Sequence, residues 1–443
     1  MKKLSTLILL FFKLYAFSQC YQSVSAGQHY VLAVKTDGDL YGWGSGALGA
    51  PPINIPTLLQ SGQNFQLISS GYDHSLAIKA DGTLWGTGSN VLGCLGIGNS
   101  SWQSTFVQVG ANTNWQSVTA GTIYSLALKT DGTMWACGWN SDGQLGNNSI
   151  TSSNVFIQVD SANNWSKISV GQQSSSAIKS DGTLWTWGSN SSGQLGDGTL
   201  LNRYVPTQVG TDNDWNSISS SGRHMVAVKT NGTLWTWGSN SSGQLGDGTF
   251  VNRNFPVQIG TDDDWQSIET APDATLALKT NGSLWVCGSR VGDGTTINRN
   301  TLININPGTT YQAISGGDAS CVTIKSDGGI WTWGSDNYNA LGNGTVTEEL
   351  APTLIANSCS LNTNEFEKNN IVLYPNPTSQ FVTINNSINF IIEKITVSDI
   401  SGKVFLEKNN NFNEINLQQF SSGMYFVQIE SNKEKFVYKV IKK

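Results

Sequence analysis

Residues 179–199 read KSDGTLWTWGSNSSGQLGDGT, and the segment returns fifty residues later, at 229–249, as KTNGTLWTWGSNSSGQLGDGT. The Asp-Gly or Asn-Gly pair near its start occurs seven times, with its first residue at Asp37, Asp81, Asp131, Asp181, Asn231, Asn281 and Asp327. Successive pairs are 44, 50, 50, 50, 50 and 46 residues apart. A period of this length is typical of a solenoid, a propeller or an array of small units.

The content of one period separates these options. In the fourth copy, four short runs lie at 165–169 (WSKIS), 175–179 (SSAIK), 183–187 (TLWTW) and 206–209 (PTQV). They are rich in β-branched and aromatic residues and bounded by Gly, Asn, Asp and Ser, which predicts strands. The Asp-Gly step between the second and third runs predicts a hairpin with a type I′ turn. Four antiparallel strands per period indicate a propeller blade, so seven periods predict a seven-bladed β-propeller.

The residues also carry a family resemblance. The pattern G-x-x-H-S-x-A-L-K-x-D-G-x-L-W-x-W-G-x-N-x-x-G-Q-L-G-D-G, seen at 71–79 followed by 181–198, resembles the regulator of chromosome condensation repeat. The resemblance covers residues 21–357 and implies a seven-bladed β-propeller. The period predicts the same fold independently of the family.

Charge argues against one class of partner. The 443 residues hold 25 Lys and Arg against 31 Asp and Glu, a net charge of −6, and no stretch is strongly basic. Nucleic acid is therefore not an expected partner. The length leaves room for a large propeller and one small further module.

The first residues, MKKLSTLILLFFKLYAFSQC, have the features of an export signal. Lys2 and Lys3 precede an apolar run at 7–12, and Ala16-Phe-Ser18 fits a cleavage site, so residues 1–18 are predicted to be a signal peptide. A transmembrane anchor is not expected, because the apolar run is short and broken by Lys13. Lipid attachment at Cys20 is an alternative with a poorly matching motif.

Export affects how the six cysteines are interpreted, because disulfides persist outside the cytoplasm. Cys137 and Cys287 share one repeat position three blades apart and are not expected to meet. Cys94 and Cys321 are expected to be buried as small apolar residues. The other two, at positions 20 and 359, flank the propeller. Since a ring brings its ends together, a Cys20–Cys359 disulfide that clamps the closure is a hypothesis, which intact-mass measurement with and without reductant tests.

One variable position precedes the strand Lys by five residues and holds Tyr30, His74, Tyr124, Ser174, His224, Ala274 and Ser320. We expect these side chains to hydrogen-bond to neighbouring blades. The three histidines are scattered and no cysteine pair has metal spacing, so neither a metal site nor a cofactor is expected.

Aromatic and basic residues give the candidate ligand-binding residues. Trp185 and Trp187 occupy positions that carry tryptophan in most blades, so they suit packing between blades. Trp102 and Trp139 lie outside the regular positions and are candidates for stacking on a sugar. Arginines recur after three G-D-G-T loops, and their planar forks suit carboxylate or phosphate ligands. The alternative is pairing with the aspartates just upstream. The arginines are Arg203, Arg253 and Arg299, and the aspartates are Asp197, Asp247 and Asp293.

Two further loop features are notable. The acidic loops 211–214 and 261–264 have ligand spacing too short for a recognised calcium loop, so solvated turns are expected. The sixth copy lacks the N-S-S-G-Q-L segment and runs from Ser289 directly into 290–294, which predicts a notch in the rim.

Residues 371–443 differ from the repeats, since they contain no Trp and lose the fifty-residue period. Short alternating runs predict a small immunoglobulin-like β-sandwich, joined to the propeller by a linker at 358–370. The motifs Y-P-N-P, D-I-S-G-K, S-S-G-M-Y and a final K-V-I-K-K resemble the type A C-terminal sorting domain of the type IX secretion system. This resemblance implies recognition by the secretion machinery, passage across the outer membrane, and display on the cell surface or release.

No catalytic arrangement is apparent. The sequence has no G-x-S-x-G elbow and no recognisable nucleophile with its base, so an enzyme is not expected. Bacterial propellers that resemble this one bind proteins. The first hypothesis is therefore a secreted or surface module that binds an extracellular protein or glycan through propeller loops. The alternative is a secreted hydrolase or lyase that acts on polysaccharide with a site built from those loops.

Overall fold

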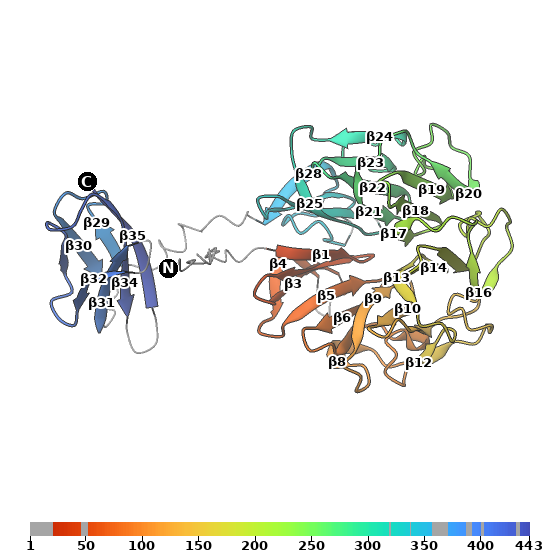
Figure 1. Ribbon diagram of the computed structural model, residues 1–443, viewed down its shortest axis with the longest axis horizontal. Coiled ribbons are helices and arrows are strands. Elements are labelled where there is room, and N and C mark those ends of the chain that lie inside the picture. The colour runs from red at the N-terminus through yellow and green to blue at the C-terminus, as the bar shows by residue number, and fades with distance from the viewer. Residues whose placement is uncertain are drawn as a thin grey trace, which may run out of the picture. The chain divides into compact units, whose positions relative to one another are not determined.

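The computed structural model describes residues 21–45, 52–318, 320–336, 338–356, 371–386, 392–399, 403–430 and 435–443. The chain divides into two compact units, Met1–Cys359 and Ser360–Lys443 (Figure 1). The predicted signal peptide at 1–18, the linker at 358–370 and the hypothetical Cys20–Cys359 bridge lie outside the described residues. They stay predictions.

The described part of the first unit contains seven four-stranded sheets, here called blades 1 to 7 in chain order. Blades 1 to 3 are β1 (Tyr21–Ala26), β2 (Tyr30–Lys35), β3 (Leu40–Gly44) and β4 (Ile53–Gln60); β5 (Phe65–Ser70), β6 (His74–Lys79), β7 (Leu84–Gly88) and β8 (Gln103–Gln108); and β9 (Trp115–Ala120), β10 (Tyr124–Lys129), β11 (Met134–Gly138) and β12 (Ser153–Gln158). A short 3₁₀ turn, η2 (Val91–Gly93), lies between β7 and β8.

Blades 4 to 7 continue the pattern without interruption. They are β13 (Trp165–Val170), β14 (Ser174–Lys179), β15 (Leu184–Gly188) and β16 (Arg203–Gln208); β17 (Trp215–Ser221), β18 (His224–Lys229), β19 (Leu234–Gly238) and β20 (Arg253–Gln258); β21 (Trp265–Ala271), β22 (Ala274–Lys279), β23 (Leu284–Gly288) and β24 (Arg299–Ile305); and β25 (Tyr311–Gly316), β26 (Ser320–Lys325), β27 (Ile330–Gly334) and β28 (Glu349–Ala356). The predicted seven-bladed propeller is confirmed, and the four runs expected in the fourth copy are β13 to β16.

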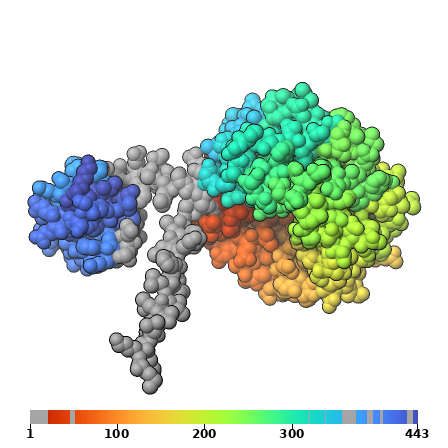
Figure 2. Space-filling model, turned by 45° about the horizontal axis from the view of Figure 1, so that its top comes forward, coloured from red at the N-terminus to blue at the C-terminus, as the bar shows by residue number. Residues whose placement is uncertain are grey.

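The blades close into a ring. In each sheet the strands pair in chain order, and the first strand lies innermost, because these first strands contact one another from blade to blade. The last blade meets the first, since β1 lies against β25 and β26 (Figure 2). Backbone and side chains join there, as the Ala26 N–H donates to Ser315 Oγ at 3.0 Å and Trp43 Nε1 donates to the Ala340 carbonyl at 3.0 Å.

The hairpin turn differs from the predicted type I′. Between β14 and β15 the Gly182 N–H donates to the Lys179 carbonyl at 2.9 Å, and Gly182 has φ +81°. Asp181 is absent from the described residues with positive φ, whereas type I′ requires positive φ at two successive positions. Its carboxylate instead accepts from the Thr183 N–H (3.0 Å) and Oγ1 (2.7 Å), which fixes a three-residue loop ending in a left-handed glycine.

Tryptophans hold adjacent blades together, as expected. Trp187 is fully buried in a core shared with Tyr124 and Leu126 of the preceding blade. Its Nε1 donates to the Gln144 carbonyl of that blade at 2.9 Å. Where the repeat position carries Cys137, the thiol donates to the Cys94 carbonyl instead. At these contacts between blades, a buried side-chain donor of one sheet therefore forms a hydrogen bond to a loop carbonyl of the preceding blade.

The described cysteines are free thiols in the interior, namely Cys94, Cys137, Cys287 and Cys321. Burial raises the pKa of Cys94, Cys287 and Cys321 to about 12 each. They therefore stay protonated and act as small packing residues.

The second unit has two sheets. One is ordered β29 (Ile371–Tyr374), β30 (Phe381–Asn386) and β33 (Glu414–Asn416); the other is ordered β32 (Val404–Lys408), β31 (Lys394–Asp399), β34 (Gly423–Glu430) and β35 (Lys435–Lys442). Val382 and Ile415 of the first share one core with Ile395 and Val427 of the second, so the unit is a β-sandwich. Its immunoglobulin-like character stays a prediction. Among the described residues, no helix is both long and apolar enough to cross a membrane.

Candidate functional site

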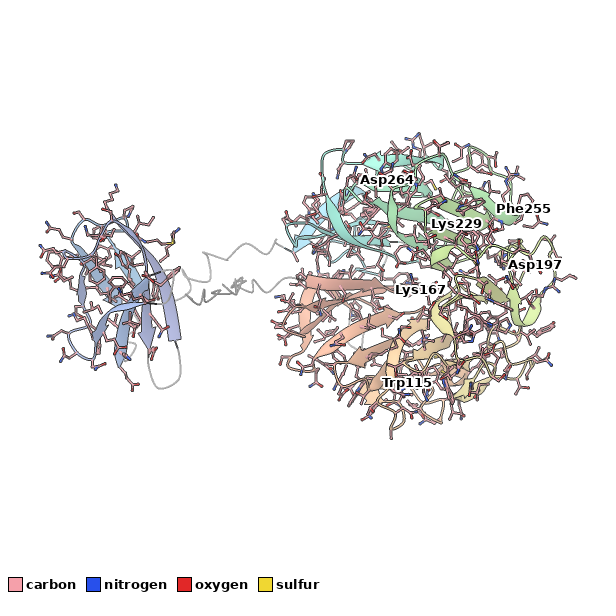
Figure 3. All side chains as sticks on the ribbon, in the orientation of Figure 1. Trp115, Lys167, Asp197, Lys229, Phe255 and Asp264 are labelled. Atoms are coloured by element: carbon pink, nitrogen blue, oxygen red, sulfur yellow. The ribbon has the colours of Figure 1, made fainter. Side chains whose placement is uncertain are left out.

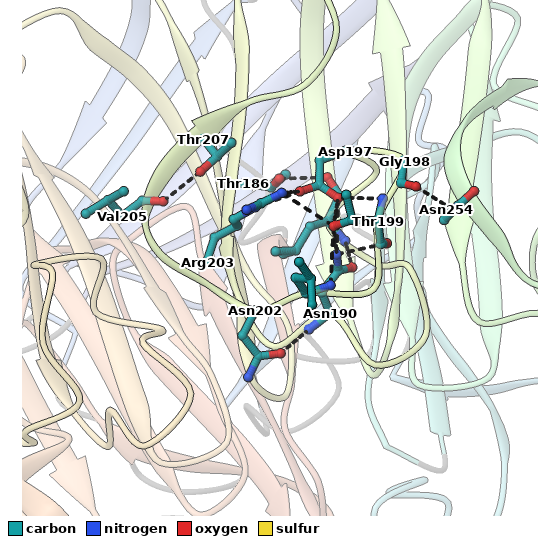
Figure 4. Close-up of polar contacts among 12 residues, drawn as sticks. Thr186, Asn190, Asp197, Gly198, Thr199, Asn202, Arg203, Val205, Thr207 and Asn254 are labelled. Atoms are coloured by element: carbon teal, nitrogen blue, oxygen red, sulfur yellow. Dashed lines mark hydrogen bonds and ion pairs between the residues drawn. The ribbon is translucent and has the colours of Figure 1, made fainter.

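In blades 4, 5 and 6, the long loop after the third strand ends in an ion pair at the outer edge of the ring. In blade 4, Arg203 donates from Nε to Asp197 Oδ2 at 2.7 Å and from a terminal nitrogen at 2.6 Å (Figure 4). Thr199 donates its N–H and hydroxyl to Asp197 Oδ1 at 2.9 and 2.7 Å. Burial opposes ionisation of Asp197, but the hydrogen bonds from Thr199 and Arg203 outweigh it and hold the pKa of this carboxyl below its ordinary value.

The same pair recurs in the next two blades. Arg253 meets Asp247 at 2.7 Å, and Arg299 meets Asp293 at 2.5 Å. The pairing alternative is therefore confirmed, because each fork is turned toward the aspartate of its own loop. About a third of each arginine side chain remains exposed. A ligand role for these arginines stays a prediction.

Exposed apolar side chains surround these ion pairs, a feature that sequence reasoning missed. They lie just after the G-D-G-T or equivalent turn and on the outer strands of blades 3 to 7, and we call them the outer apolar belt. Its members are Ile150, Val155, Leu200, Leu201, Tyr204, Val205, Phe250, Val251, Phe255, Ile297 and Val346. Exposure ranges from 43% for Val205 to 73% for Val346. Figure 3 shows Phe255 and Asp197 at the outer margin of the ring. The period itself was the available signal, since an apolar residue recurs two or three positions after the glycine that ends this loop in four successive blades, at Leu200, Phe250, Ile297 and Val346.

The two tryptophans predicted to bind sugar lie in different blades. Trp102 precedes β8 and is 50% exposed, whereas Trp139 follows β11 and packs partly against the core of blades 3 and 4. No ring contact among the described residues joins Trp102 to Trp139. Their role as sugar contacts stays a prediction, without support from a shared platform.

A different aromatic group gathers where the ring closes. His29, Tyr72 and Tyr338 come from blades 1, 2 and 7. The His29 ring centroid lies 3.6 Å from that of Tyr338 and 5.9 Å from that of Tyr72. Tyr72 is 39% exposed and Tyr338 is 47% exposed. Sequence reasoning missed this trio, because only ring closure brings residues about 300 positions apart into contact.

At the variable position before the strand Lys, four of the seven side chains bond to the next blade as expected. Ala274 has no polar side chain, and Ser320 Oγ is buried without a hydrogen-bond partner among the described residues, so the expectation is wrong there. His74 Nε2 lies 3.0 Å from Ser125 Oγ of the next blade, and His224 Nε2 lies 3.1 Å from Thr275 Oγ1. Tyr30 and Tyr124 donate their hydroxyls to backbone carbonyls of the next blade. Burial lowers the pKa of His74 and of His224 to about 4 each, so both imidazoles are neutral at pH 7. The described residues contain no group of three or more His, Cys, Asp or Glu placed to hold a metal ion.

The acidic loops bind lysine. Lys229 Nζ lies 2.6 Å from Asp212 and 3.0 Å from Asp214, and it sits 4.8 Å from the ring centroids of both Trp215 and Trp235. The equivalent Lys279 repeats the arrangement. These carboxylates therefore anchor the lysine over the tryptophans.

The shortened sixth copy leaves a small cavity where the notch was expected. It measures about 30 Å³ and is lined partly by Asp273, Ser289, Arg290 and Asp318. Arg290 adopts φ +48° and donates from Nε to Glu348 at 2.9 Å. The cavity is about the size of one water molecule, so it is no site for a larger ligand.

Comparison with solved structures shows the same fold. Human WBSCR16 is 22% identical with a TM-score of 0.63, and the match covers 70% of this chain and 87% of that one. Prp20p from Saccharomyces cerevisiae, in a structure described with its binding properties to Gsp1p and histones, is 19% identical with a TM-score of 0.64 over 80% and 90% of the two chains. Yeast RCC1 bound to Kap60 is 18% identical with a TM-score of 0.64, and the match covers 84% of this chain and 93% of that one. Curated proteins gave no match.

Family models match both units. Two models of the regulator of chromosome condensation (RCC1) repeat match residues 131–178, 181–228, 231–278 and 327–368, and residues 65–94, 115–144, 165–194 and 215–244. Together they span more than half of the chain. A model of the secretion system C-terminal sorting domain matches residues 372–443. The chain is therefore an RCC1-repeat β-propeller with a C-terminal sorting domain for type IX secretion.

Proposed function

We propose that this protein is an exported binding module, which docks an extracellular protein through the outer apolar belt of its propeller. The sorting domain directs export, and the propeller provides the binding surface. The belt is the observation that supports this proposal. Its apolar side chains are 43% to 73% exposed on five consecutive blades, with arginine ion pairs among them.

The composition of the belt suits a protein partner. Contiguous exposed apolar side chains rimmed by polar groups mark interaction sites. Protein interfaces are enriched in aromatic residues and arginine and depleted of other charges. Tyr204, Phe250 and Phe255 supply the aromatic rings, and the arginines keep about a third of each side chain open.

The belt is also held rigid. The Gly198 N–H of blade 4 donates to the Asn254 carbonyl of blade 5, which ties each apolar loop to the next outer strand. A loop that is ordered before binding loses less conformational entropy when a partner docks. The belt is therefore a preformed surface.

A second candidate is glycan binding at the trio of His29, Tyr72 and Tyr338. Tyr72 and Tyr338 are 39% and 47% exposed, and stacking on a sugar requires exposed aromatic side chains. Gln28, beside His29 in sequence, adds an amide that donates to Asp318 at 3.0 Å. The trio replaces the separated Trp102 and Trp139 as the better-supported sugar surface.

The experiment is a protein and glycan array probed with the mature chain, residues 19–443. The belt variant combines Leu201→Ser, Phe250→Ser and Phe255→Ser. Leu58→Ser is the matched control, because Leu58 is 47% exposed on β4, outside the belt. Loss of a protein ligand in the belt variant alone supports the proposal, and equal binding by both variants overturns it. Tyr72→Ala with Tyr338→Ala tests the glycan candidate in the same way.

Two further arms test the remaining alternatives. The first substitutes Arg203, Arg253 and Arg299 together by Ala. If these arginines only stabilise their own loops, the affinity for the protein ligand identified on the array is unchanged. A polysaccharide-degradation screen runs beside the array. Turnover of a polysaccharide without stoichiometric binding would replace the binding module with the hydrolase or lyase alternative.

A further inference from the structure

The seven inner strands enclose a cavity of about 350 Å³ on the propeller axis. Every blade contributes the end of its inner strand and the turn that follows. The lining is mostly Ser, Thr and Gly, so hydroxyl and backbone groups face the interior. The volume falls in the range of small-molecule sites.

One position of the inner strand recurs in all seven blades of this lining. It is held by Ser25, Ser69, Thr119, Ser169, Ser219, Glu269 and Ser315. Five of the hydroxyls accept a hydrogen bond from a backbone N–H of the next inner strand, at 2.8 to 3.1 Å: Ser25 from Ser70, Ser69 from Ala120, Ser169 from Ser220, Ser219 from Thr270 and Ser315 from Ala26. Glu269 is the single carboxylate in this ring.

Within the described ranges, no hydrogen bond or ion pair joins Glu269 to a cationic side chain. Of the strands that pack most closely against β21, β17 and β25 carry no charged side chain, β18 carries His224 and Lys229, and β22 carries Lys279. His224 is hydrogen-bonded to Thr275, and both lysines bind aspartates beside Trp215 and Trp265. The adjoining turns carry Arg223, Asp273 and Asp318. Glu269 accepts hydrogen bonds from the Ser219 hydroxyl, at 3.4 Å from Oε2, and from the backbone of Thr270.

In the part of the chain that the structure describes, the rest of the lining carries no positive charge, and Glu269 and Asp318 are the only charged residues in it. Gln28 donates from Nε2 to Asp318 at 3.0 Å, and its Oε1 is buried with no donor. Carboxylates and an unpartnered amide oxygen both accept hydrogen bonds, so the cavity has a surplus of acceptors. It therefore fits a guest that brings N–H donors and positive charge.

We propose that the axial cavity binds a small organic cation, whose ammonium group donates to the Glu269 carboxylate while its body lies along the hydroxyl-lined axis. A bare metal ion fits less well. Divalent ions take several carboxylate or carbonyl ligands, and the described residues hold no group of three acidic, histidine or cysteine residues. The volume is also that of a molecule and far exceeds that of an ion.

Protonation of Glu269 competes with the cation. Burial raises the pKa of Glu269 to about 7, and the hydrogen bonds from the Ser219 hydroxyl and the Thr270 backbone offset this only in part. The cation binds the ionised form, so its affinity rises with pH while the ammonium group stays charged. Between pH 6 and pH 8 the ionised fraction grows about tenfold, and the affinity is expected to follow.

The test uses calorimetric titration of the mature chain, residues 19–443, with putrescine as the probe and 1,4-butanediol as its uncharged counterpart. Putrescine is expected to bind with an affinity that rises about tenfold from pH 6 to pH 8, and butanediol is not. Glu269→Gln and Glu269→Ser are expected to weaken binding at least tenfold and to remove its pH dependence. Asp263→Ser, at an exposed acidic residue outside the cavity, is the matched control and should bind as the unaltered chain does.

Folding is checked separately. Five of the seven blades carry Ser at this position, so Glu269→Ser is expected to keep the thermal midpoint of the unaltered protein or raise it. Absence of putrescine binding by the unaltered chain overturns the proposal, and so does equally tight binding by a folded Glu269→Gln variant. Neither outcome bears on the outer apolar belt, which is a separate surface.

Discussion

Asn254 and Gly198 join adjacent blades through two hydrogen bonds. The Gly198 N–H donates to the Asn254 carbonyl at 2.8 Å, and Asn254 Nδ2 donates back to the Gly198 carbonyl at 2.8 Å (Figure 4). Three more blade pairs have the same reciprocal joint, through Asn154 with Gly98, Asn300 with Gly248, and Asn54 with Gly344. The last of these spans the ring closure. Hydrogen bonds thus link neighbouring blades at the outer edge as well as in the tryptophan-filled interior.

The first prediction concerns this joint. Asn254→Ala removes the side-chain donor and leaves the Gly198 carbonyl with one partner fewer, so the free energy of unfolding should fall by about 1 kcal/mol. Urea unfolding followed by tryptophan fluorescence measures the change. Asn213→Ala, at an exposed loop residue, is the control and should lie close to the unaltered protein. If Asn254→Ala and Asn213→Ala had the same free energy of unfolding, the hydrogen bonds between Asn254 and Gly198 would not contribute to stability.

A second prediction separates backbone strain from steric overlap at glycine. Gly182 and Gly198 have nearly the same φ, +81° and +80°. A Cβ at Gly182 would meet the Asn213 carbonyl oxygen at 2.0 Å, whereas one at Gly198 meets nothing within 4 Å. Gly198→Ala should therefore cost about 1 kcal/mol from conformation alone, and Gly182→Ala should cost clearly more. Thermal midpoints measure both, and similar midpoints would contradict the three-residue turn described here.

The third prediction tests the buried indole donor. Trp187→Phe keeps an aromatic ring but leaves the Gln144 carbonyl without its 2.9 Å donor, which should lower the free energy of unfolding by about 1–3 kcal/mol. Trp102→Phe serves as the control, since Trp102 is half exposed and should tolerate the change. Chemical denaturation of both variants decides whether the hydrogen bond between blades matters.

Acid should weaken the fold through two histidines. The pKa of His74 and of His224 is about 4 in the folded chain, below the ordinary value of 6.5, so the unfolded chain binds more protons between these limits. Their contribution is fully present above pH 6.5 and is lost as the pH falls toward 4, by up to about 3 kcal/mol each. His74→Gln with His224→Gln should flatten the stability profile over this window. His29→Gln is the control, and an unchanged slope in the double variant would contradict the prediction.

The last prediction concerns export. Removal of residues 371–443 deletes the sorting domain, so the protein should accumulate in the periplasm. Cell fractionation with immunodetection of the propeller measures this, with the full chain as reference. Surface delivery of the truncated protein would show that residues 371–443 are dispensable for export.

Much of the propeller could be predicted from the sequence because the information is local. Alternating apolar residues, Gly-bounded turns and a near-constant period define β13 to β16 and their six counterparts without long-range contacts. The turn type was wrong for an equally local reason. Asp181 binds Thr183 with its carboxylate and keeps negative φ, so only Gly182 needs the left-handed region.

The candidate sites were less predictable. The arginine row was visible as a repeat, but the choice between a ligand and Asp197 depended on side-chain geometry. The trio around His29 and the carboxylate of Glu269 were missed, because each depends on what the ring places opposite or beside it. Within its own repeat, Glu269 is an ordinary strand residue. It stands out only when the ring places it beside the Ser and Thr residues that hold the same position in the other six blades.

By itself, the sequence determined the type of blade, the number of blades and the sorting domain. Each follows from short sequence patterns, which either repeat along the chain or match the motifs of a family. Only the tertiary structure decided which side chains meet between blades and which line the axis. Such contacts join residues about fifty positions apart, or about 290 across the closure as between Gln28 and Asp318. Ring closure fixes them all at once, and no single repeat contains the information.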